Sequence, residues 1–196
     1  MDNPAHTEGL RERKRRQTLQ RIAEVGLRLF LAKGYEATTL EEIAAAADIA
    51  RRTFFYYFKS KDDILLAYQA GFADALKAAI LAESTDVSPL EAVRNALIRL
   101  ATGFQSPQAI AIDRLMRANE ALRARKQANY LQQEQAVFDA LCELWPGKKR
   151  QPALRLVAMA AIGAMRIAVE EWSQHDGKRP LAKFVREAFA NLKAEI

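Results

Sequence analysis

Cysteine and histidine are scarce in this sequence of 196 residues, which contains Cys142, His6, His175 and no others of either type. A single cysteine cannot form an intrachain disulfide, and these three side chains are too few for a metal cluster of thiolate or imidazole ligands. We therefore expect no disulfide, no metal and no cofactor, and we expect Cys142 to be a buried structural thiol.

Long hydrophobic runs are also missing, although half of the residues are apolar. No window approaches the roughly 18 uninterrupted apolar residues of a membrane span, and the segment from Met1 to Leu10 lacks the apolar centre of a signal peptide. The sequence predicts a cytoplasmic protein that does not enter a membrane. Its length suits one large domain, or a small domain followed by a larger one.

Catalytic patterns are missing as well. No serine, cysteine or carboxylate stands in a recognisable nucleophile or acid–base spacing, and no glycine-rich loop could hold a phosphate group. A helical enzyme with a pocket remains an alternative, but we predict that the protein is not an enzyme.

Positive charge is plentiful and unevenly distributed. The formal charge of +6 favours an anionic partner, although a solvated helix face would explain a run of basic residues equally well. The basic residues crowd into the first third of the chain: Arg11, Arg13, Lys14, Arg15, Arg16, Arg21, Arg28, Arg51, Arg52, Lys59 and Lys61.

The residue types predict an all-α fold. Leucine, alanine, arginine, glutamate and lysine dominate, whereas glycine and proline fall between periodic segments, and no stretch is a convincing strand. Hydrophobic spacing and cap residues predict helices over 11–32, 39–47, 50–58, 60–83, 88–104, 109–145 with a bend near 118–122, 153–174 and 181–193.

Two short helices, 39–47 and 50–58, have the dimensions of a helix-turn-helix, whose second helix enters the DNA major groove. Thr39 and Glu42 form a capping box at the first helix, and Ser60 is the predicted cap of the helix that follows the pair. Between them lies the run RRTFFYYF, residues 51–58. The spacing of about 100° per residue puts Phe54 and Phe58 on one side.

At this point the sequence resembles the tetracycline-repressor (TetR) family of bacterial regulators. The resemblance lies in residues 39–64, TLEEIAAAADIARRTFFYYFKSKDDI, and in Gly34-Tyr35 and Thr38-Thr39 after the first helix. It implies a disordered tail over 1–10, a three-helix helix-turn-helix domain over 11–66, and a larger helical ligand-binding and dimerisation domain over 67–196. It also implies a repressor that binds an inverted-repeat DNA operator as a homodimer and is released by a small hydrophobic effector.

Carried over residue by residue, the resemblance implies that Thr39 and Tyr57 touch phosphates and that Lys61 holds a phosphate. The groove-facing residues would be Arg51, Arg52, Thr53, Phe55 and Tyr56. Two positions depart from the family pattern, since Asp48 replaces a glycine and Ala50 replaces a capping serine or threonine. An aspartate tolerates a left-handed turn, but the missing cap oxygen should cost about 1 kcal/mol.

The helix at 153–174 is apolar nearly all round, as expected of a helix buried between subunits or at the centre of a monomer. The predicted dimer interface comprises Leu154, Val157, Ala161, Met165 and Trp172, with Phe184 and Phe189 of the last helix. The other side of the same helix is apolar or small too, with Leu156, Ala160, Gly163 and Ile167.

The effector site is the feature that the sequence predicts least clearly. Apolar residues predicted to line a cavity are Phe104, Met116, Tyr130, Phe138, Met159 and Met165, and polar anchors could come from Arg114, Arg117, Glu120 and Arg166. Such stripes are more often ordinary core and surface. The segments FFYYFKSKDD and 119–123 resemble family members with acyl-thioester-like ligands. A DNA-binding regulator without a ligand is the alternative.

Overall fold

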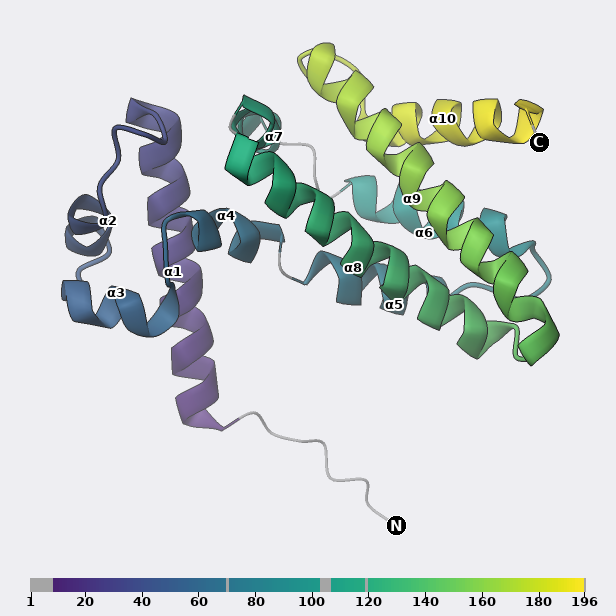
Figure 1. Cartoon of the computed structure of the whole chain (residues 1–196), viewed down its shortest axis with the longest axis horizontal. Helices are drawn as coiled ribbons and strands as arrows, with labels where there is room; N and C mark the ends of the chain where they lie inside the picture. Colours follow the sequence, from purple (N-terminus) through teal and green to yellow (C-terminus); the bar gives the residue numbers. More distant parts are fainter. Residues whose placement is uncertain (1–8, 70, 103–106, 119, 196) are drawn as a thin grey trace. The chain divides into compact units, whose positions relative to one another are not determined.

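The computed structural model describes residues 9–69, 71–102, 107–118 and 120–195, and within these ranges it contains helices and their connections but no strand. The chain divides into two compact units, Met1–Gln69 and Ala70–Ile196. Unit 1 holds α1 (Leu10–Lys33), α2 (Leu40–Ala46), α3 (Arg51–Tyr57) and α4 (Asp62–Gln69). Unit 2 holds α5 (Phe72–Leu81), α6 (Pro89–Ala101), α7 (Pro107–Ala118), α8 (Glu120–Leu144), the short 3-10 helix η2 (Lys148–Arg150), α9 (Gln151–Gln174) and α10 (Leu181–Glu195). Figure 1 labels them.

In unit 1, α1 packs against α2 and α4, and α2 packs against α3. The buried residues include Leu27 and Phe30 of α1 together with Ile43 and Phe54. α1 and α4 lie close together at Gly26, where an added Cβ atom would lie 2.7 Å from the Cδ1 atom of Ile64. A glycine at this position therefore lets the two helices cross closely.

The predicted single helix over 60–83 is wrong, because the chain is divided there into α4 and α5. Gly71 has φ of 88°, a left-handed conformation that a helix does not contain and that glycine adopts without steric cost. The boundary between the two units falls at the same place. The predicted bend near 118–122 corresponds to the junction of α7 and α8.

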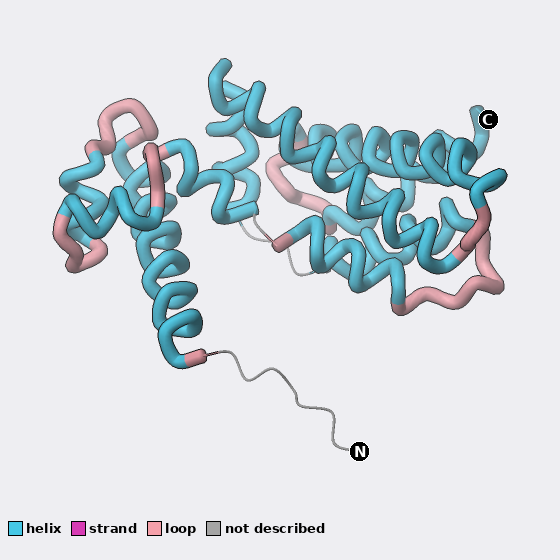
Figure 2. The backbone as a smooth tube through the Cα atoms, turned by 60° about the horizontal axis from the view of Figure 1, so that its bottom comes forward, coloured by secondary structure: helices cyan, strands magenta, loops and turns pink. Residues whose placement is uncertain are grey.

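In unit 2, α9 packs against α6, α7, α8 and α10, and α5 packs against α6 and α8. The long helices α8 and α9 run side by side (Figure 1), and Figure 2 shows that helices and loops make up the described parts of the chain. Their facing sides form one apolar core with residues of α5, α6 and α10. The segment 148–174 is long and apolar enough to pass for a membrane span by composition, as the core helices of soluble proteins also do. Cys142 is only partly buried, and burial raises the pKa of its thiol.

The predicted dimer interface needs correction. Val157 is half-buried, and the other predicted residues are buried within the core of a single chain: Leu154, Ala161, Met165, Trp172, Phe184 and Phe189. The strongest apolar stripe of α9 thus faces its own subunit. The opposite side of the helix is the exposed one, where Leu156 is 67% exposed, Met159 50% and Ile167 59%.

Candidate nucleic-acid interface

The first helix of the pair, α2, begins with the predicted capping box. The Thr39 hydroxyl oxygen accepts from the backbone N–H of Glu42 at 3.2 Å, and the Glu42 carboxylate accepts from the Thr39 N–H at 2.8 Å. Lys33 also donates to Glu42, and this bond, followed by the Thr39 N–H, lowers the pKa of Glu42 to about 2. The cap therefore contributes to stability above the ordinary pKa of a glutamate, and loses that contribution as the pH falls toward 2.

The turn between α2 and α3 is built around Asp48, which takes the expected left-handed conformation with φ of 51°. The N–H of Asp48 donates to the Ala45 carbonyl at 3.1 Å, and the N–H of Ile49 donates to the Ala44 carbonyl at 3.0 Å. Ala50 then begins α3 without a side-chain cap, because an alanine side chain has no oxygen that could accept a hydrogen bond. The Ala50 carbonyl accepts from the backbone N–H groups of Thr53 at 2.8 Å and Phe54 at 3.1 Å.

The aromatic run of α3 and its end is divided between core and surface. Phe54 is 0% exposed and Phe58 4%, and their ring centroids lie 5.7 Å apart. Phe55 is 46% exposed and Tyr56 70%. This division agrees with the angular spacing of the sequence. Buried rings thus anchor a short helix whose other rings meet solvent.

Arginines extend the exposed face of α3. Arg51 forms an ion pair with Glu41 at 3.1 Å and lies over the Phe55 ring, with both charged side chains well exposed. Such surface pairs contribute little, so Arg51 is available to a stronger anion. Arg52 is exposed, and within the described ranges its guanidinium has no hydrogen bond or ion pair. Thr53 and Tyr57 are half-buried at the edges of this face.

Lys61 forms hydrogen bonds that the sequence did not predict. Its ammonium group donates to the backbone carbonyls of Tyr35 at 2.8 Å and Thr38 at 3.4 Å, and it lies 4.3 Å from the centroid of the Tyr35 ring. The Tyr35 hydroxyl in turn donates to Asp62. Lys61 therefore ties the α1–α2 loop to the start of α4. A phosphate contact of Lys61 stays a prediction.

The cap of α4 also differs from expectation. The Ser60 hydroxyl is buried without a hydrogen-bond partner among the described atoms. The carboxylate of Asp63 instead accepts from the backbone N–H groups of Lys59 at 2.8 Å and Ser60 at 3.2 Å, which precede α4, and so ties the first turn of the helix to the chain before it. Lys59 follows the end of α3 by two residues and is exposed. It is a basic residue for which the sequence predicted no contact with DNA.

The predicted effector residues are scattered over unit 2, except Phe104, which lies outside the described residues. Met116 and Met165 are buried in the core, whereas Met159 is half exposed on the outer side of α9 and so does not line an interior cavity. The Phe138 ring lies under the guanidinium of Arg155, and the Tyr130 ring under that of Arg166. A pocket of about 170 Å³ lies instead between α7 and α9, lined by Arg114, Arg117, Glu170, Ser173 and Gln174.

Comparison with known proteins gives two family matches. Residues 22–68 match the family described as bacterial regulatory proteins, tetR family, and residues 87–196 match the MftR C-terminal domain. The HTH-type transcriptional regulator TcmR of Streptomyces glaucescens is 41% identical over 88 residues, which are 45% of this chain and 39% of TcmR. MftR of Mycobacterium tuberculosis, a regulator assigned to mycofactocin biosynthesis, is 27% identical over 163 residues, or 82% of each protein.

A solved structure shares the architecture. The crystal structure of FadR from Thermus thermophilus, a TetR-family repressor in complex with lauroyl-CoA, superposes with a TM-score of 0.58 at 23% identity, covering 89% of this chain and 92% of FadR. The helix-turn-helix of unit 1 and the helical unit 2 match the two parts of that family. The chain belongs to the TetR family of bacterial transcriptional regulators.

Proposed function

We propose that the protein is a cytoplasmic repressor that binds an inverted-repeat DNA operator as a homodimer and is released by a small-molecule effector. The observation that carries the proposal is the exposed face of α3, where Arg51, Arg52, Phe55 and Tyr56 stand around a helix anchored by buried Phe54. As a member of a family of regulators, it acts by binding, and we propose no catalytic activity.

The chemistry of this face suits a major groove. Guanidinium groups donate to guanine edges or to phosphates, ring surfaces pack on thymine methyl groups, and tyrosine hydroxyls donate to phosphate oxygens. Thr39 at the start of α2 and Tyr57 at the end of α3 lie at the two ends of the pair, where a DNA backbone would pass. The exposed ammonium of Lys59 adds a third backbone contact in this proposal.

Replacing Arg52 by alanine should weaken operator binding roughly 30-fold or more, because the change removes a contact worth at least about 1 kcal/mol from each of two subunits. The melting temperature should stay within about a degree of the wild type, since the side chain is exposed. Fluorescence anisotropy with a labelled operator measures the affinity. Arg150→Ala, an exposed arginine of η2, is the matched control and should bind normally. Equal affinities of the two variants would remove Arg52 from the interface.

Tyr57→Phe deletes one hydroxyl and leaves the ring contact with Tyr56 in place. If that hydroxyl holds a phosphate, the affinity for the operator and the affinity for unrelated DNA should both fall roughly tenfold, because phosphate contacts carry no sequence information. Competition binding with both duplexes measures this. A loss confined to the operator would assign Tyr57 to base reading.

The homodimer is proposed to form through the exposed side of α9. Leu156, Met159 and Ile167 are large apolar residues on this side, and the partly exposed Ala160 and Gly163 let another helix approach closely. A twofold axis puts the same stripe on both partners, so an apolar surface would cover itself. Two α3 helices about one DNA turn apart, roughly 34 Å, would then read the inverted repeat.

The effector is proposed to bind in unit 2. The FadR relative holds lauroyl-CoA, and unit 2 here has a pocket between α7 and α9. A ligand with different affinity for DNA-competent and incompetent conformations would shift their populations without touching DNA. A screen for molecules that release the operator tests this step. Failure of every compound, with a protein that binds DNA well, would favour a regulator without a small-molecule ligand.

A further inference from the structure

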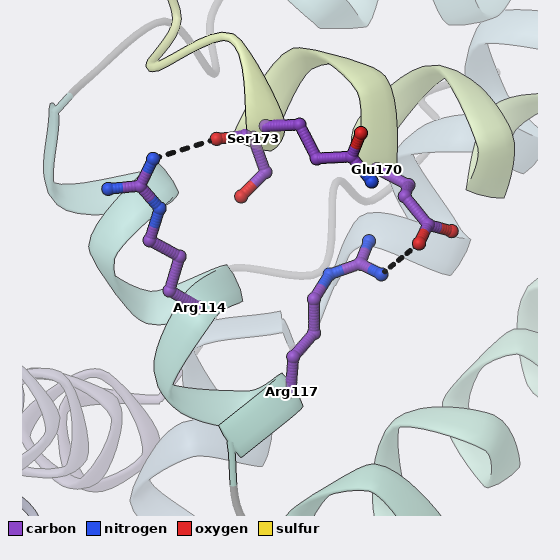
Figure 3. A pocket seen from close by; sticks show the side chains of 5 residues that line it. Arg114, Arg117, Glu170 and Ser173 are labelled. Atoms are coloured by element: carbon purple, nitrogen blue, oxygen red, sulfur yellow. Dashed lines mark hydrogen bonds and ion pairs between the residues drawn. The ribbon is translucent and has the colours of Figure 1, made fainter.

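The pocket of unit 2 has a polar wall on each side. Arg114 and Arg117 reach it from α7, and Glu170, Ser173 and Gln174 line it from α9 (Figure 3). Its volume of about 170 Å³ is below the range of about 300–1,000 Å³ that is usual for drug-sized ligands. The space therefore suits a compact molecule that carries both apolar and polar atoms.

Both arginines hold carboxylates or carbonyls from α9 and the turn after it. Arg114 donates to the Ser173 carbonyl at 2.9 Å and to Asp176, and Arg117 pairs with Glu170 at 3.3 Å (Figure 3). A guanidinium group has five N–H donors, so these bonds leave several of them for a ligand. These donors suit carboxylate oxygens, because the two guanidinium groups already bind the carboxylates of Glu170 and Asp176.

Ser173 adds a hydroxyl group to the lining of the pocket. The residue is only 3% exposed, and its backbone carbonyl accepts from Arg114 at 2.9 Å. A serine hydroxyl has one O–H donor, which suits a carboxylate oxygen. This hydroxyl could donate to a ligand oxygen held by the arginines.

A buried charge network fixes one of the two arginines. The Nε atom of Arg117 donates to Asp113 at 2.7 Å, and Asp113 also accepts from Lys126 of α8. Asp113 is 8% exposed and Lys126 7%. Burial opposes charge on both groups, but the neighbouring Lys126 and Arg117 hold the pKa of Asp113 below its ordinary value. Arg117 is thereby held in place by an ionised carboxylate.

Basic groups outnumber acidic ones around this network. Besides the residues already named, Arg166 lies over the Tyr130 ring with its guanidinium 4.7 Å from the centroid, and Lys178 lies near Asp176. Burial, followed by the charge of Asp113, raises the pKa of Tyr130 to about 12, so the phenol stays neutral. An anion entering the pocket would therefore meet a surplus of positive charge.

We infer that the pocket between α7 and α9 binds a small organic carboxylate, whose oxygens are held by Arg114, Arg117 and the hydroxyl of Ser173. The inference rests on the proposed function, because it names the class of effector that the regulator would sense. In binding, the ligand carboxylate takes the place of Glu170 on Arg117. That exchange costs little, because the pair is partly exposed, with the Glu170 side chain 51% exposed. A doubly charged phosphate group is less suited, since Glu170 and Asp176 would repel it more strongly.

Isothermal titration of the full-length protein with benzoate and hexanoate, and with benzamide and hexanamide as neutral counterparts, tests the inference. At least one carboxylate should bind with a dissociation constant below 10 mM (on the order of −3 kcal/mol), and at least tenfold tighter than its amide. Inorganic phosphate is a further probe and should bind more weakly than that carboxylate. No carboxylate binding in this range, equal binding of amide and acid, or tighter binding of phosphate would each overturn the inference.

Three variants locate the site, and a fourth is the control. Arg114→Gln should weaken carboxylate binding about tenfold or more, because a charge-assisted contact is lost, and Arg114→Lys should restore part of it. Glu170→Gln should tighten binding about threefold, because a competing carboxylate is removed. Lys149→Gln, at the opposite end of α9 in η2, removes the same charge outside the pocket and should have no effect. Unchanged binding in Arg114→Gln, with a wild-type melting temperature, would contradict the site.

Operator release is measured separately in the same samples. Carboxylate binding that depends on Arg114 but leaves the protein on DNA would support the site and contradict a ligand-released repressor. Release by neutral compounds only would support the repressor and contradict the carboxylate site.

Discussion

Phe54→Ala should lower the free energy of unfolding of unit 1 by about 3–5 kcal/mol, the usual cost of emptying a fully buried phenylalanine site. The residue is 0% exposed and its ring packs against those of Phe55 and Phe58. Loss of this much stability in a small unit should also abolish operator binding, because α3 would no longer be held on its support. Denaturant unfolding followed by circular dichroism, with operator binding on the same sample, measures both effects.

The neighbouring Phe55 is the matched control, since it is the same residue type at the next position and is 46% exposed. Phe55→Ala should change stability by no more than about 1 kcal/mol, because little buried area is lost. It should weaken binding of the operator while the protein stays folded. Equal destabilisation by the two variants would contradict the division of the aromatic run into an anchor and a DNA-facing surface.

Ile167→Glu should convert the homodimer to a monomer, because a twofold axis brings two added carboxylates into an apolar interface. A single subunit contacts one half-site only, so operator affinity should fall by roughly a thousandfold or more, toward non-specific binding. Light scattering and anisotropy measure mass and affinity. Leu131→Glu places the same charge at a similarly exposed residue of α8, 66% exposed compared with 59% for Ile167, and should stay dimeric. Two monomeric variants, or two dimeric ones, would contradict the proposed α9 interface.

The sequence predicted the local features of unit 1 well, because they depend on residues close together in the chain. The capping box of Thr39, the left-handed Asp48 and the burial of Phe54 and Phe58 all follow from spacing within one or two helical turns. The uncapped start at Ala50 follows from its side chain alone. Local patterns therefore sufficed for the shape of the helix-turn-helix.

The sequence failed where contacts join distant segments. Lys61 reaches carbonyls more than twenty residues away, and this partner could not be read from a motif that places lysine beside DNA. Ser60 looked like a cap by residue type, but its hydroxyl has no partner among the described atoms, whereas the Asp63 carboxylate accepts from the backbone N–H groups of Lys59 and Ser60. Residue types alone did not predict which side chain of this segment would form the hydrogen bonds.

The same limit applies to unit 2. Both sides of α9 are apolar, so the hydrophobic period does not predict which side packs against the same subunit. In the structure Leu154 and Trp172 are buried, whereas Leu156 and Ile167 are exposed. The sequence offered Arg114 and Arg117 as polar anchors together with Glu120 and Arg166, with ordinary surface as the alternative. The position of the two α7 arginines opposite Glu170 and Ser173 depends on how α7 packs against α9, about fifty residues later in the chain.

Selection of bound duplexes from a random DNA pool by the purified full-length protein tests whether it reads DNA as a symmetric dimer. We expect enrichment of an inverted repeat whose half-sites are centred about one helical turn, 10–10.5 base pairs, apart. Arg52→Ala should enrich this repeat less strongly, with relaxed sequence preference within each half-site. Enrichment of a single unrepeated site, or of no sequence at all, would contradict a regulator that reads DNA as a symmetric dimer through α3.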